Sequence, residues 1–486
     1  MSPEMKPEIK ELLDRAQAWI DAHKAEFISE IQLLARVPSV SRADLAQPGA
    51  PFGPECRRVL DVALERGRYY GFETADHDGY AGSIYTGDLE NSLGIIGHLD
   101  VVPVGEGWIY PQFGATYLPE HDALVGRGVE DNKGPAVAGL FAMRMLREFG
   151  WPLKHGLRLI CGLSEETGMQ DMVELKRRGV PFPRTSLVPD AGFPVNYGQK
   201  GSLDAEIVAD CTGNLTSFDS GTVRNVIPDS ACCTLALDMN AVTAGLARVE
   251  PELQARITLE PCDGGVRITA AGKPGHAASP DGGINAIQLL SRALTQSELL
   301  SGSCRDAIRE LSELTADAYG VSEGVAFEDE ISGKLTLVYG VAHLKQGQLT
   351  VSVDCRASIT IDQKWLVDTL KADWARRGYQ VARLTTNEPF YIPRDDPRVT
   401  ALQQLYEQVT GRDEQPYTMG GGTYSRVVPN AISFGAGMPG INRVVEFMPE
   451  GHGGAHGMDE TLCMEKVYTC ARIYVAALAL LDQIVE

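Results

Sequence analysis

The sequence lacks an uninterrupted apolar run long enough to cross a membrane. A spanning helix needs about 18 or more consecutive apolar residues, and the segment that comes nearest, residues 473–481, follows Arg472 and precedes Asp482. We expect this segment to belong to a final core helix. The N-terminal segment has acids scattered among its bases and no apolar core of the signal-peptide type, so the expected location is the cytoplasm.

Positive charge and paired cysteines are also scarce. Lysine and arginine number 44 against 65 acidic residues, a net charge of −21, which argues against nucleic acids and anionic membranes as partners. The ten cysteines include no CxxC pair, so we expect reduced, mostly buried thiols rather than a zinc finger or a disulfide framework. With 486 residues, 44 % of them hydrophobic, the chain suffices for two or three folded domains.

The pattern of strands and helices changes along the chain. Residues 8–36 have the spacing of an amphipathic helix, and from residue 93 short apolar runs alternate with helical segments, which predicts a largely parallel sheet. Ligands bind beyond the carboxyl ends of such strands, so the segments GHLD, LSEE and VPDA are expected at one edge. Between about 202 and 386, alternating strands such as residues 349–356 are interleaved with helices, one of them capped by Asp362 and stopped by Gly378.

Turn-prone flanks bound this middle region. They lie at residues 197–201 and 387–398, and the strand and helix pattern resumes after the second flank. We therefore predict an α/β domain made of residues 1–200 and 387–486, with an α+β domain inserted at residues 201–386.

Candidate catalytic residues follow the apolar runs. His98 and Asp100 lie two residues apart at the end of one run, so the carboxylate can orient the imidazole; the alternative is a plain surface pair. Asp131, in GRGVEDNKGP, precedes a helical pattern. It is either an N-cap or a metal ligand whose two oxygens can bridge two ions.

Other acids and imidazoles extend this set. Glu165 and Glu166 end a second run, and because successive side chains diverge, one can bind a metal while the other takes a proton from water; the alternative is a solvated acidic loop. Asp190 follows a third run, and His452 and His456 lie in a glycine-rich segment. Imidazole and carboxylate donors without thiolate suit zinc, manganese or cobalt. Two divalent ions would reduce the −5 charge of the five carboxylates to −1.

The order of these motifs resembles a known family. GHLDVVP, GRGVEDNKGP, SEETG, PDA, GKPGHAASP and HGMDE are similar to the M20 family of metallopeptidases, and GGGTYSR at residues 420–426 is similar to its dipeptidase V branch. The resemblance runs from about residue 10 to the C-terminus. It implies a catalytic αβα sandwich with an inserted α+β lid domain, and two divalent ions per chain, most often zinc, with manganese or cobalt as alternatives.

The resemblance also implies roles for matching residues. Asp131 would bridge the ions, with His98 and Asp190 completing one site and Glu166 and His456 the other. Glu165 would be the general base and Asp100 the partner of His98. Two residues depart from the family pattern, Asn132 after the bridging aspartate and Gln199 in GQKG, but neither removes a ligand.

Substrate contacts are implied in the lid and in the GGGTYSR motif. His276 would stabilise the oxyanion, although alone it reads as a loop histidine. Arg356 would clamp a substrate carboxylate, whereas its place on the polar face of residues 349–356 otherwise favours a solvated arginine. The remaining substrate-binding candidates are Asn225, Gly421, Gly422, Thr423 and Arg426. Residues 197–201 and 387–394 are the expected hinges of a closing lid.

The resulting expectation is a dipeptidase. Water activated by two metal ions would attack the amide of a short peptide with free termini, including β-alanyl dipeptides such as carnosine. An N-acyl amino acid deacylase is the nearest rival, because it would not need a site for a free amine. A two-metal phosphoesterase is more distant, since the chain is acidic and has no phosphate-cradling lysine motif, and a non-catalytic relative would lack a ligand or the base. The resemblance implies a monomer, with a homodimer as the alternative.

Overall fold

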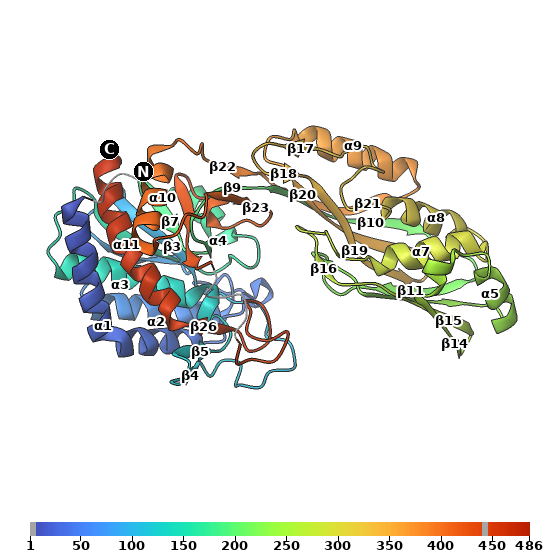
Figure 1. The fold of residues 1–486 in the computed structure, drawn as a ribbon, viewed down its shortest axis with the longest axis horizontal. Helices are drawn as coiled ribbons and strands as arrows, with labels where there is room; N and C mark the ends of the chain where they lie inside the picture. Colours follow the sequence, from blue (N-terminus) through green and yellow to red (C-terminus); the bar gives the residue numbers. More distant parts are fainter. Residues whose placement is uncertain (1–5, 440–445) are drawn as a thin grey trace. The chain divides into compact units, whose positions relative to one another are not determined.

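The computed structural model describes residues 6–439 and 446–486, which divide into two compact units. Unit 1 contains the described residues up to Tyr197, Ile392–Tyr417 and the described residues from Thr423 onward. Unit 2 contains Gly198–Tyr391 and Thr418–Gly422. The chain therefore leaves unit 1, forms most of unit 2 and returns, as the ribbon colours show (Figure 1).

A mixed sheet forms the centre of unit 1. Its strand order is β1-β2-β6-β3-β7-β24-β9-β22, in which the residues of β22 are assigned to unit 2, and β23 pairs with β9. The central pairs β6–β3, β3–β7 and β7–β24 are parallel, whereas the outer pairs are antiparallel. The bounds are β1 (Glu73–Asp76), β2 (Ala81–Thr86), β3 (Ser92–His98), β6 (Gly156–Gly162), β7 (Thr185–Val188), β9 (Val195–Gln199), β22 (Phe390–Tyr391), β23 (Tyr417–Met419) and β24 (Ala431–Phe434).

The prediction of a largely parallel sheet therefore holds for the centre but not for the edges. Only residues 77–80 join β1 to β2, and a connection this short allows only antiparallel pairing, because a parallel crossover needs a dozen or more residues. Asp78 and Gly79 in this turn both have positive φ.

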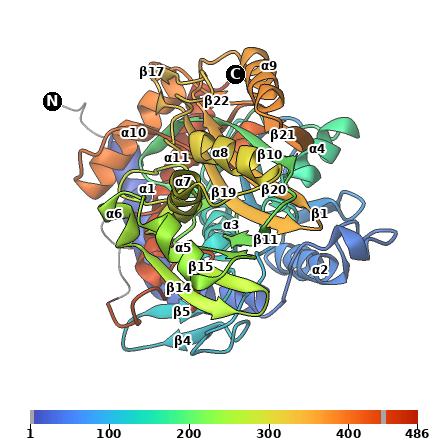
Figure 2. The same cartoon turned by 90° about the vertical axis from the view of Figure 1, so that its right-hand side faces the viewer.

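Helices cover both faces of this sheet (Figures 1 and 2). On one face, α3 packs its Gly139 against Ile95 of β3, and on the other face α4 packs Met172 and Leu175 against a cluster that includes Ile96. Neighbouring residues of a strand point to opposite faces, so β3 is buried on both sides. The helices are α1 (Pro7–Ala35), α2 (Pro54–Tyr69), α3 (Gly134–Glu148), α4 (Gln170–Arg177), α10 (Pro397–Thr410) and α11 (Met464–Ile484).

The last helix, α11, is the core helix that the sequence predicts. By length and composition it could cross a membrane, but 72 % of its most apolar stretch is buried inside the structure. It packs against α1, α3 and α10. The thiols also match the prediction, because all ten cysteines are free and seven of them are buried.

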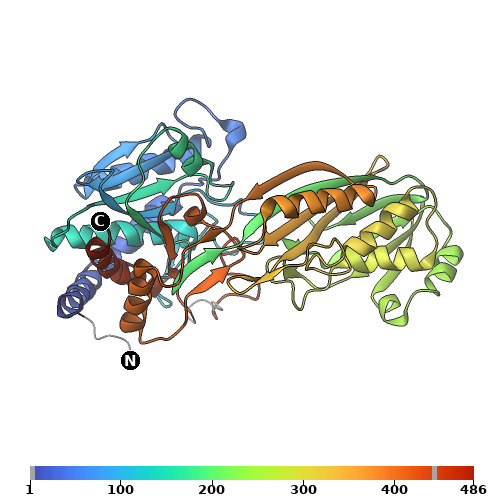
Figure 3. The same cartoon turned by 90° about the horizontal axis from the view of Figure 1, so that it is seen from above.

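Unit 2 is an eight-stranded antiparallel sheet with its helices on one face (Figure 3). The strand order is β14-β15-β13-β11-β19-β20-β10-β21. The strands are β10 (Gly201–Asp210), β11 (Leu215–Ser220), β13 (Ser230–Leu235), β14 (Ile257–Cys262), β15 (Gly265–Ala271), β19 (Thr336–Lys345), β20 (Gln348–Ala357) and β21 (Gln380–Asn387). The helices are α5 (Met239–Leu246), α6 (Pro251–Gln254), α7 (Ala286–Ser297), α8 (Cys304–Leu314) and α9 (Gln363–Arg376).

The alternation within β20 explains why the helices cover only one face. Leu349, Val351, Val353 and Cys355 are fully buried in the core that also contains residues of α7, α8 and α9. Polar side chains such as Ser352 and Arg356 alternate with them and point to the opposite face. Helix α9 begins where predicted, because the Asp362 carboxylate accepts hydrogen bonds from the backbone N–H groups of Lys364 and Trp365.

Short strands outside the two sheets adjoin loops that contain candidate site residues. In unit 1, β4 and β26 both pair with β5, and β8 pairs with β25. In unit 2, β12 pairs with β16. These strands are β4 (Thr116–Leu118), β5 (Ala123–Val125), β8 (Ala191–Gly192), β12 (Val226–Ile227), β16 (Gly275–His276), β25 (Ala436–Gly437) and β26 (Thr461–Cys463).

Candidate metal centre

The ends of three parallel strands bring candidate ligands to one edge of the sheet in unit 1. His98 is the last residue of β3, Glu165 and Glu166 follow β6, and Asp190 follows β7. Because β6 and β7 both pair with β3 in parallel, their carboxyl ends are neighbours. The prediction that GHLD, LSEE and VPDA share an edge is therefore confirmed.

Asp131 lies between two imidazoles. Its Oδ1 is 2.9 Å from Nε2 of His98, and its Oδ2 is 3.1 Å from Nε2 of His456. One further carboxylate accompanies each imidazole: Oδ1 of Asp190 is 3.6 Å from His98 Nε2, and Oε1 of Glu166 is 3.0 Å from His456 Nε2. Each oxygen of Asp131 thus faces a separate cluster of donors, the arrangement that a bridging carboxylate requires.

The alternative for Asp131, an N-cap, does not occur. Helix α3 begins at Gly134 with Lys133 in the N-cap position and no side-chain cap bond. Asp131 has non-helical φ and ψ of −119° and 94°. Its neighbour Asn132 donates from Nδ2 to the Pro189 carbonyl and, at 3.2 Å, to Oδ1 of Asp190, so the residue that departs from the family pattern helps to orient a candidate ligand.

Donor atoms of several side chains lie close enough to share an ion. Two groups, His98 with Glu165 and Asp190 and His98 with Asp131 and Glu166, each have ligand atoms within 4.8 Å of one another. Glu165, which the resemblance makes the general base, is thus as near to these donors as the ligands are. Imidazole and carboxylate donors in such groups fit zinc, manganese or cobalt.

The electrostatics of the site also favour bound cations. Burial first, and then the charge of Asp190, raises the pKa of Glu165 well above its usual range, and burial also raises the pKa of Glu166 and Asp190. Hydrogen bonds to Asp131 and Glu166 raise the pKa of His456 to about 10. Protons held by His456 and by these carboxyl groups therefore offset part of the crowded negative charge, and divalent ions would displace such protons.

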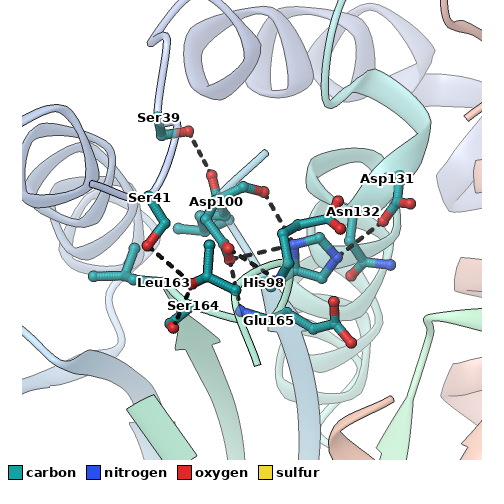
Figure 4. A network of polar contacts seen from close by, with 12 residues as sticks. Ser39, Ser41, His98, Asp100, Asp131, Asn132, Leu163, Ser164 and Glu165 are labelled. Carbon is teal, nitrogen blue, oxygen red and sulfur yellow. Dashed lines mark hydrogen bonds and ion pairs between the residues drawn. The ribbon is translucent and has the colours of Figure 1, made fainter. Parts of the chain in front are cut away.

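Asp100 contacts more than His98 (Figure 4). The His98 Nδ1 lies 3.0 Å from the Asp100 backbone carbonyl and 3.5 Å from its carboxylate. The carboxylate, fully buried, accepts hydrogen bonds of 3.2 Å from the backbone N–H groups of Glu165 and Glu166. Asp100 therefore orients the imidazole and also fixes the loop that carries both glutamates.

A second buried carboxylate holds the residues just before these glutamates. Asp171 accepts hydrogen bonds from the N–H groups of Leu163 and Ser164 and from the Tyr424 hydroxyl. Burial raises the pKa of Asp171 to about 6. A Cβ atom at Gly162 would lie 1.9 Å from the Tyr424 oxygen. Asp171 is not predicted from the sequence. The GGGTYSR motif could have indicated it, because the tyrosine of this motif, Tyr424, donates its hydrogen bond to Asp171.

His452 does not take part in the clusters around Asp131. Its Nδ1 lies 2.5 Å from Oδ2 of Asp459. Asp459 in turn accepts from the backbone N–H groups of Ile109 and Tyr110. Of the two histidines in the glycine-rich segment, His456 is the one whose imidazole meets Asp131.

Two of the predicted substrate-binding residues, Asn225 and His276, lie side by side in unit 2. Val226, next to Asn225, pairs with His276 in the β12–β16 ladder, and the Ala277 N–H donates to the Asn225 carbonyl. The Nδ1 of His276 accepts a hydrogen bond from the Ala278 N–H at 3.1 Å. This leaves the proton of the neutral ring on Nε2, which can therefore donate. Although the side chain is exposed, partial desolvation, and then the charge of Arg356, lowers the pKa of His276, which favours the neutral ring.

Arg356 is not the solvated arginine that its place on the polar face suggests. Its side chain is 15 % exposed, and it donates from Nε and Nη2 to the two oxygens of Asp354 at 2.7 and 2.8 Å. Its Nη1 donates to the Gly420 carbonyl at 3.3 Å. The bidentate pairing therefore already occupies one edge of the guanidinium.

The GGGTYSR motif divides between the units. Gly421 and Gly422 belong to unit 2, and Thr423 and Arg426 belong to unit 1. Thr423 is 2 % exposed, caps the short 3-10 helix Tyr424–Arg426 and bonds the Ser433 hydroxyl. These contacts give Thr423 a structural role in unit 1.

A family model matches most of the chain. The model described as peptidase family M20/M25/M40 matches residues 94–480. The chain belongs to this family. As an M20 peptidase it is a hydrolase of a metallopeptidase family, which agrees with the resemblance of its motifs and with the donor atoms described above.

Curated relatives and solved structures agree with this M20 assignment. "Putative dipeptidase YtjP" of Bacillus subtilis is 30 % identical over 468 residues, covering 94 % of this chain and 97 % of the relative. The yeast dipeptidase Dug1p has a TM-score of 0.58 at 13 % identity, with 97 % and 98 % of the two chains covered. Human carnosine dipeptidase 1 has a TM-score of 0.56 at 16 % identity, with 97 % and 99 % covered. These structures support the two-domain M20 fold.

Proposed function

We propose that this M20 peptidase is a dipeptidase that cleaves the amide bond of short peptides with free N- and C-termini. The observation that carries the proposal is the placement of Asp131, with one carboxylate oxygen facing His98 and the other facing His456. The dipeptidase designation of the Bacillus subtilis relative supports the substrate class. β-Alanyl dipeptides such as carnosine belong to the substrates to be tested.

Five side chains would hold two divalent ions. Asp131 would contribute one oxygen to each ion, His98 and Asp190 would complete one set, and the other set would be Glu166 and His456. When bound, such ions acidify water and polarise the substrate carbonyl. His98, Glu166 and Asp190 lie at or just after strand ends, and Asp131 and His456 lie in loops. This order of ligands along the chain is the one that the resemblance implies.

Glu165 would move the proton. Asp100 and Asp171 hold the backbone around it, because they accept hydrogen bonds from the N–H groups of residues 163–166. Burial raises the pKa of Glu165, which suits a carboxylate that takes a proton from the attacking water and passes it to the leaving amine.

The residues of unit 2 would bind the substrate. His276 would donate from Nε2 to the developing oxyanion, because its Nδ1 already accepts the Ala278 N–H. Arg356, Asn225, Gly421 and Gly422 would bind the C-terminal carboxylate, with Arg426 as a further candidate.

The test uses protein stripped of metal by a chelator. Free dipeptides, N-acetyl amino acids and tripeptides are assayed while zinc, manganese or cobalt is added back. We expect metal-dependent cleavage of the free dipeptides alone. Cleavage of the acylated amino acids instead would make the protein a deacylase, and no amide cleavage with any ion would contradict the proposal.

A further inference from the structure

Arg127 and Glu460 are among the fully buried charged side chains of unit 1 that are not proposed ligands. Glu460 is 0 % exposed and Arg127 is 1 % exposed, and they form an ion pair of 2.7 Å between Arg127 Nη1 and Glu460 Oε2. Taking two charges out of water is costly unless further hydrogen bonds satisfy them. The further bonds of this pair lead to the two loops that carry Asp131 and His456.

Glu460 fixes the loop that carries Asp131. Its Oε1 accepts from the backbone N–H groups of Glu130 and Asp131 at 2.9 and 3.0 Å, and its Oε2 accepts from the N–H of Gly128 at 3.0 Å. Together with Arg127 this makes four donors to one carboxylate. The backbone of Asp131 itself is therefore held by a residue that lies 329 positions away in the chain.

Arg127 fixes the loop that carries His456. Its Nη2 donates to the carbonyls of His456 and Gly457, each at 3.1 Å. His456 needs such support, because its side chain is 55 % exposed and its φ of +62° is a left-handed conformation that residues other than glycine rarely adopt. Packing of the imidazole alone would not hold it against Asp131.

The ion pair lies where two paired strands separate. Thr461 of β26 pairs with Val125 of β5, and the Gly126 N–H donates to the Glu460 carbonyl. Beyond this point one segment leads through Arg127 to Asp131, and the other leads back to His456. The ladder brings the two charged residues together, and their side chains continue the connection to both loops.

We propose that Arg127 and Glu460 are positioning residues that set the affinity of the site for its ions by fixing the backbones of Asp131 and His456. This inference rests on the proposed function, in which these two residues are ligands. The pair contacts backbone groups of the two loops and contributes no proposed ligand atom.

The two residues have separable effects. Arg127 reaches the His456 loop, whereas Glu460 holds the backbone of Asp131, whose carboxylate serves both ions. Arg127→Lys keeps a positive charge beside Glu460 but removes the planar fork that reaches two carbonyls. This variant should lower the affinity mainly for the ion that His456 would bind. Glu460→Gln replaces one carboxylate oxygen with an NH2 group, which cannot accept a hydrogen bond, so either the Gly128 N–H or the N–H groups of Glu130 and Asp131 lose their acceptor. It also removes the charge that pairs with Arg127, and it should lower the affinity of the site for both ions.

The experiment measures zinc affinity directly, on metal-free full-length protein, by competition with a chromophoric chelator. Loss of a residue that orients metal ligands typically lowers affinity roughly 10–100-fold, and we expect this for both ions in Glu460→Gln. The matched control is Asp482→Asn. Asp482 is also buried and accepts hydrogen bonds from Lys154 and His155, which carry no proposed ligand. The Asp482→Asn variant should have a lower melting temperature and an unchanged zinc affinity.

Three outcomes would overturn the proposal. The first is a folded Glu460→Gln variant that binds zinc as tightly as wild type. The second is a loss of zinc affinity in Glu460→Gln that is no larger than the loss in Asp482→Asn. If Glu460→Gln does not fold, unchanged affinity of both ions in Arg127→Lys decides against it. Because the readout is binding, wild-type protein that binds two zinc ions but cleaves no peptide would contradict the proposed function and leave this inference standing.

Discussion

The two groups of candidate residues are supported in different ways. In unit 1, buried carboxylates brace the loops that carry ligands and base: Asp100 and Asp171 hold residues 163–166, and Glu460 holds Asp131. In unit 2, His276 ends a two-residue strand and is exposed. Groups that must share ions need fixed positions, whereas groups that bind substrate tolerate a lighter support. The predictions below test whether this difference reflects function.

The largest expected effect is that of Glu165→Gln. Removing a general base typically lowers kcat by about 10²–10⁴-fold, and because Gln keeps the shape of the side chain, both ions should remain bound. Dipeptide turnover and bound zinc are measured on the same sample. Glu166→Gln is the comparison, since it should lose metal as well as activity. A Glu165→Gln enzyme that keeps its turnover would remove Glu165 from the role of base.

A smaller loss is expected for His276→Ala. Removing one donor to an oxyanion typically costs about 10²–10³-fold in kcat, while KM for a dipeptide should change little and metal content not at all. The control is His343→Ala, because His343 is another histidine of unit 2, with a side chain that is 40 % exposed and pairs with Asp219. Equal losses in both variants, or a change confined to KM, would contradict the oxyanion role.

The residues of this site show which contacts can be predicted from the sequence and which cannot. The order of the apolar runs predicted correctly that His98, Glu165 and Asp190 share an edge, because parallel neighbours end together. The spacing of HGMDE did not reveal the role of Glu460, since its contacts depend on the pairing of β5 with β26 across more than 300 residues. Long-range register of this kind is not encoded in local periodicity.

In unit 2, the alternation of residues predicted the face on which Arg356 lies but not the partner of its side chain. It placed Arg356 correctly on the polar face of β20 but gave no sign that Asp354, two residues earlier on the same face, would take up its guanidinium. Likewise, the HxD spacing predicted contact between Asp100 and His98 but not the hydrogen bonds of Asp100 to the glutamate loop. Side-chain partners depend on burial, which a single strand pattern does not give.

The pH dependence of stability tests one buried acid of unit 2. Glu323 in unit 2 is 4 % exposed and accepts hydrogen bonds from the hydroxyls of Tyr339 and Ser322. Burial raises its pKa to about 7 from an ordinary 4.5. The folded state then binds a proton that the unfolded state has lost, so stability falls as pH rises from 4.5 to 7 and levels off above it.

Glu323→Gln should remove this fall. Relative to wild type, the variant should gain up to about 3 kcal/mol of unfolding free energy at pH 8, and the gain should shrink toward pH 4.5. Denaturant unfolding of metal-free protein across this pH range provides the measurement. A difference between the two proteins that is independent of pH would mean that Glu323 ionises normally.

The smallest expected effect is that of Arg356→Met on substrates with a free carboxylate. Hydrogen bonds to charged groups contribute about 1.5–3 kcal/mol, and since Asp354 already occupies one edge of the guanidinium, we expect a rise in KM near the lower limit, roughly 10-fold. C-terminally amidated peptides should show no such rise. Arg383→Met is the control, because Arg383 lies near Glu206 on the same sheet. An equal rise for amidated peptides would mean that Arg356 orders Gly420 and Asp354 rather than binding the substrate carboxylate, and the difference between the two units would then rest on His276 alone.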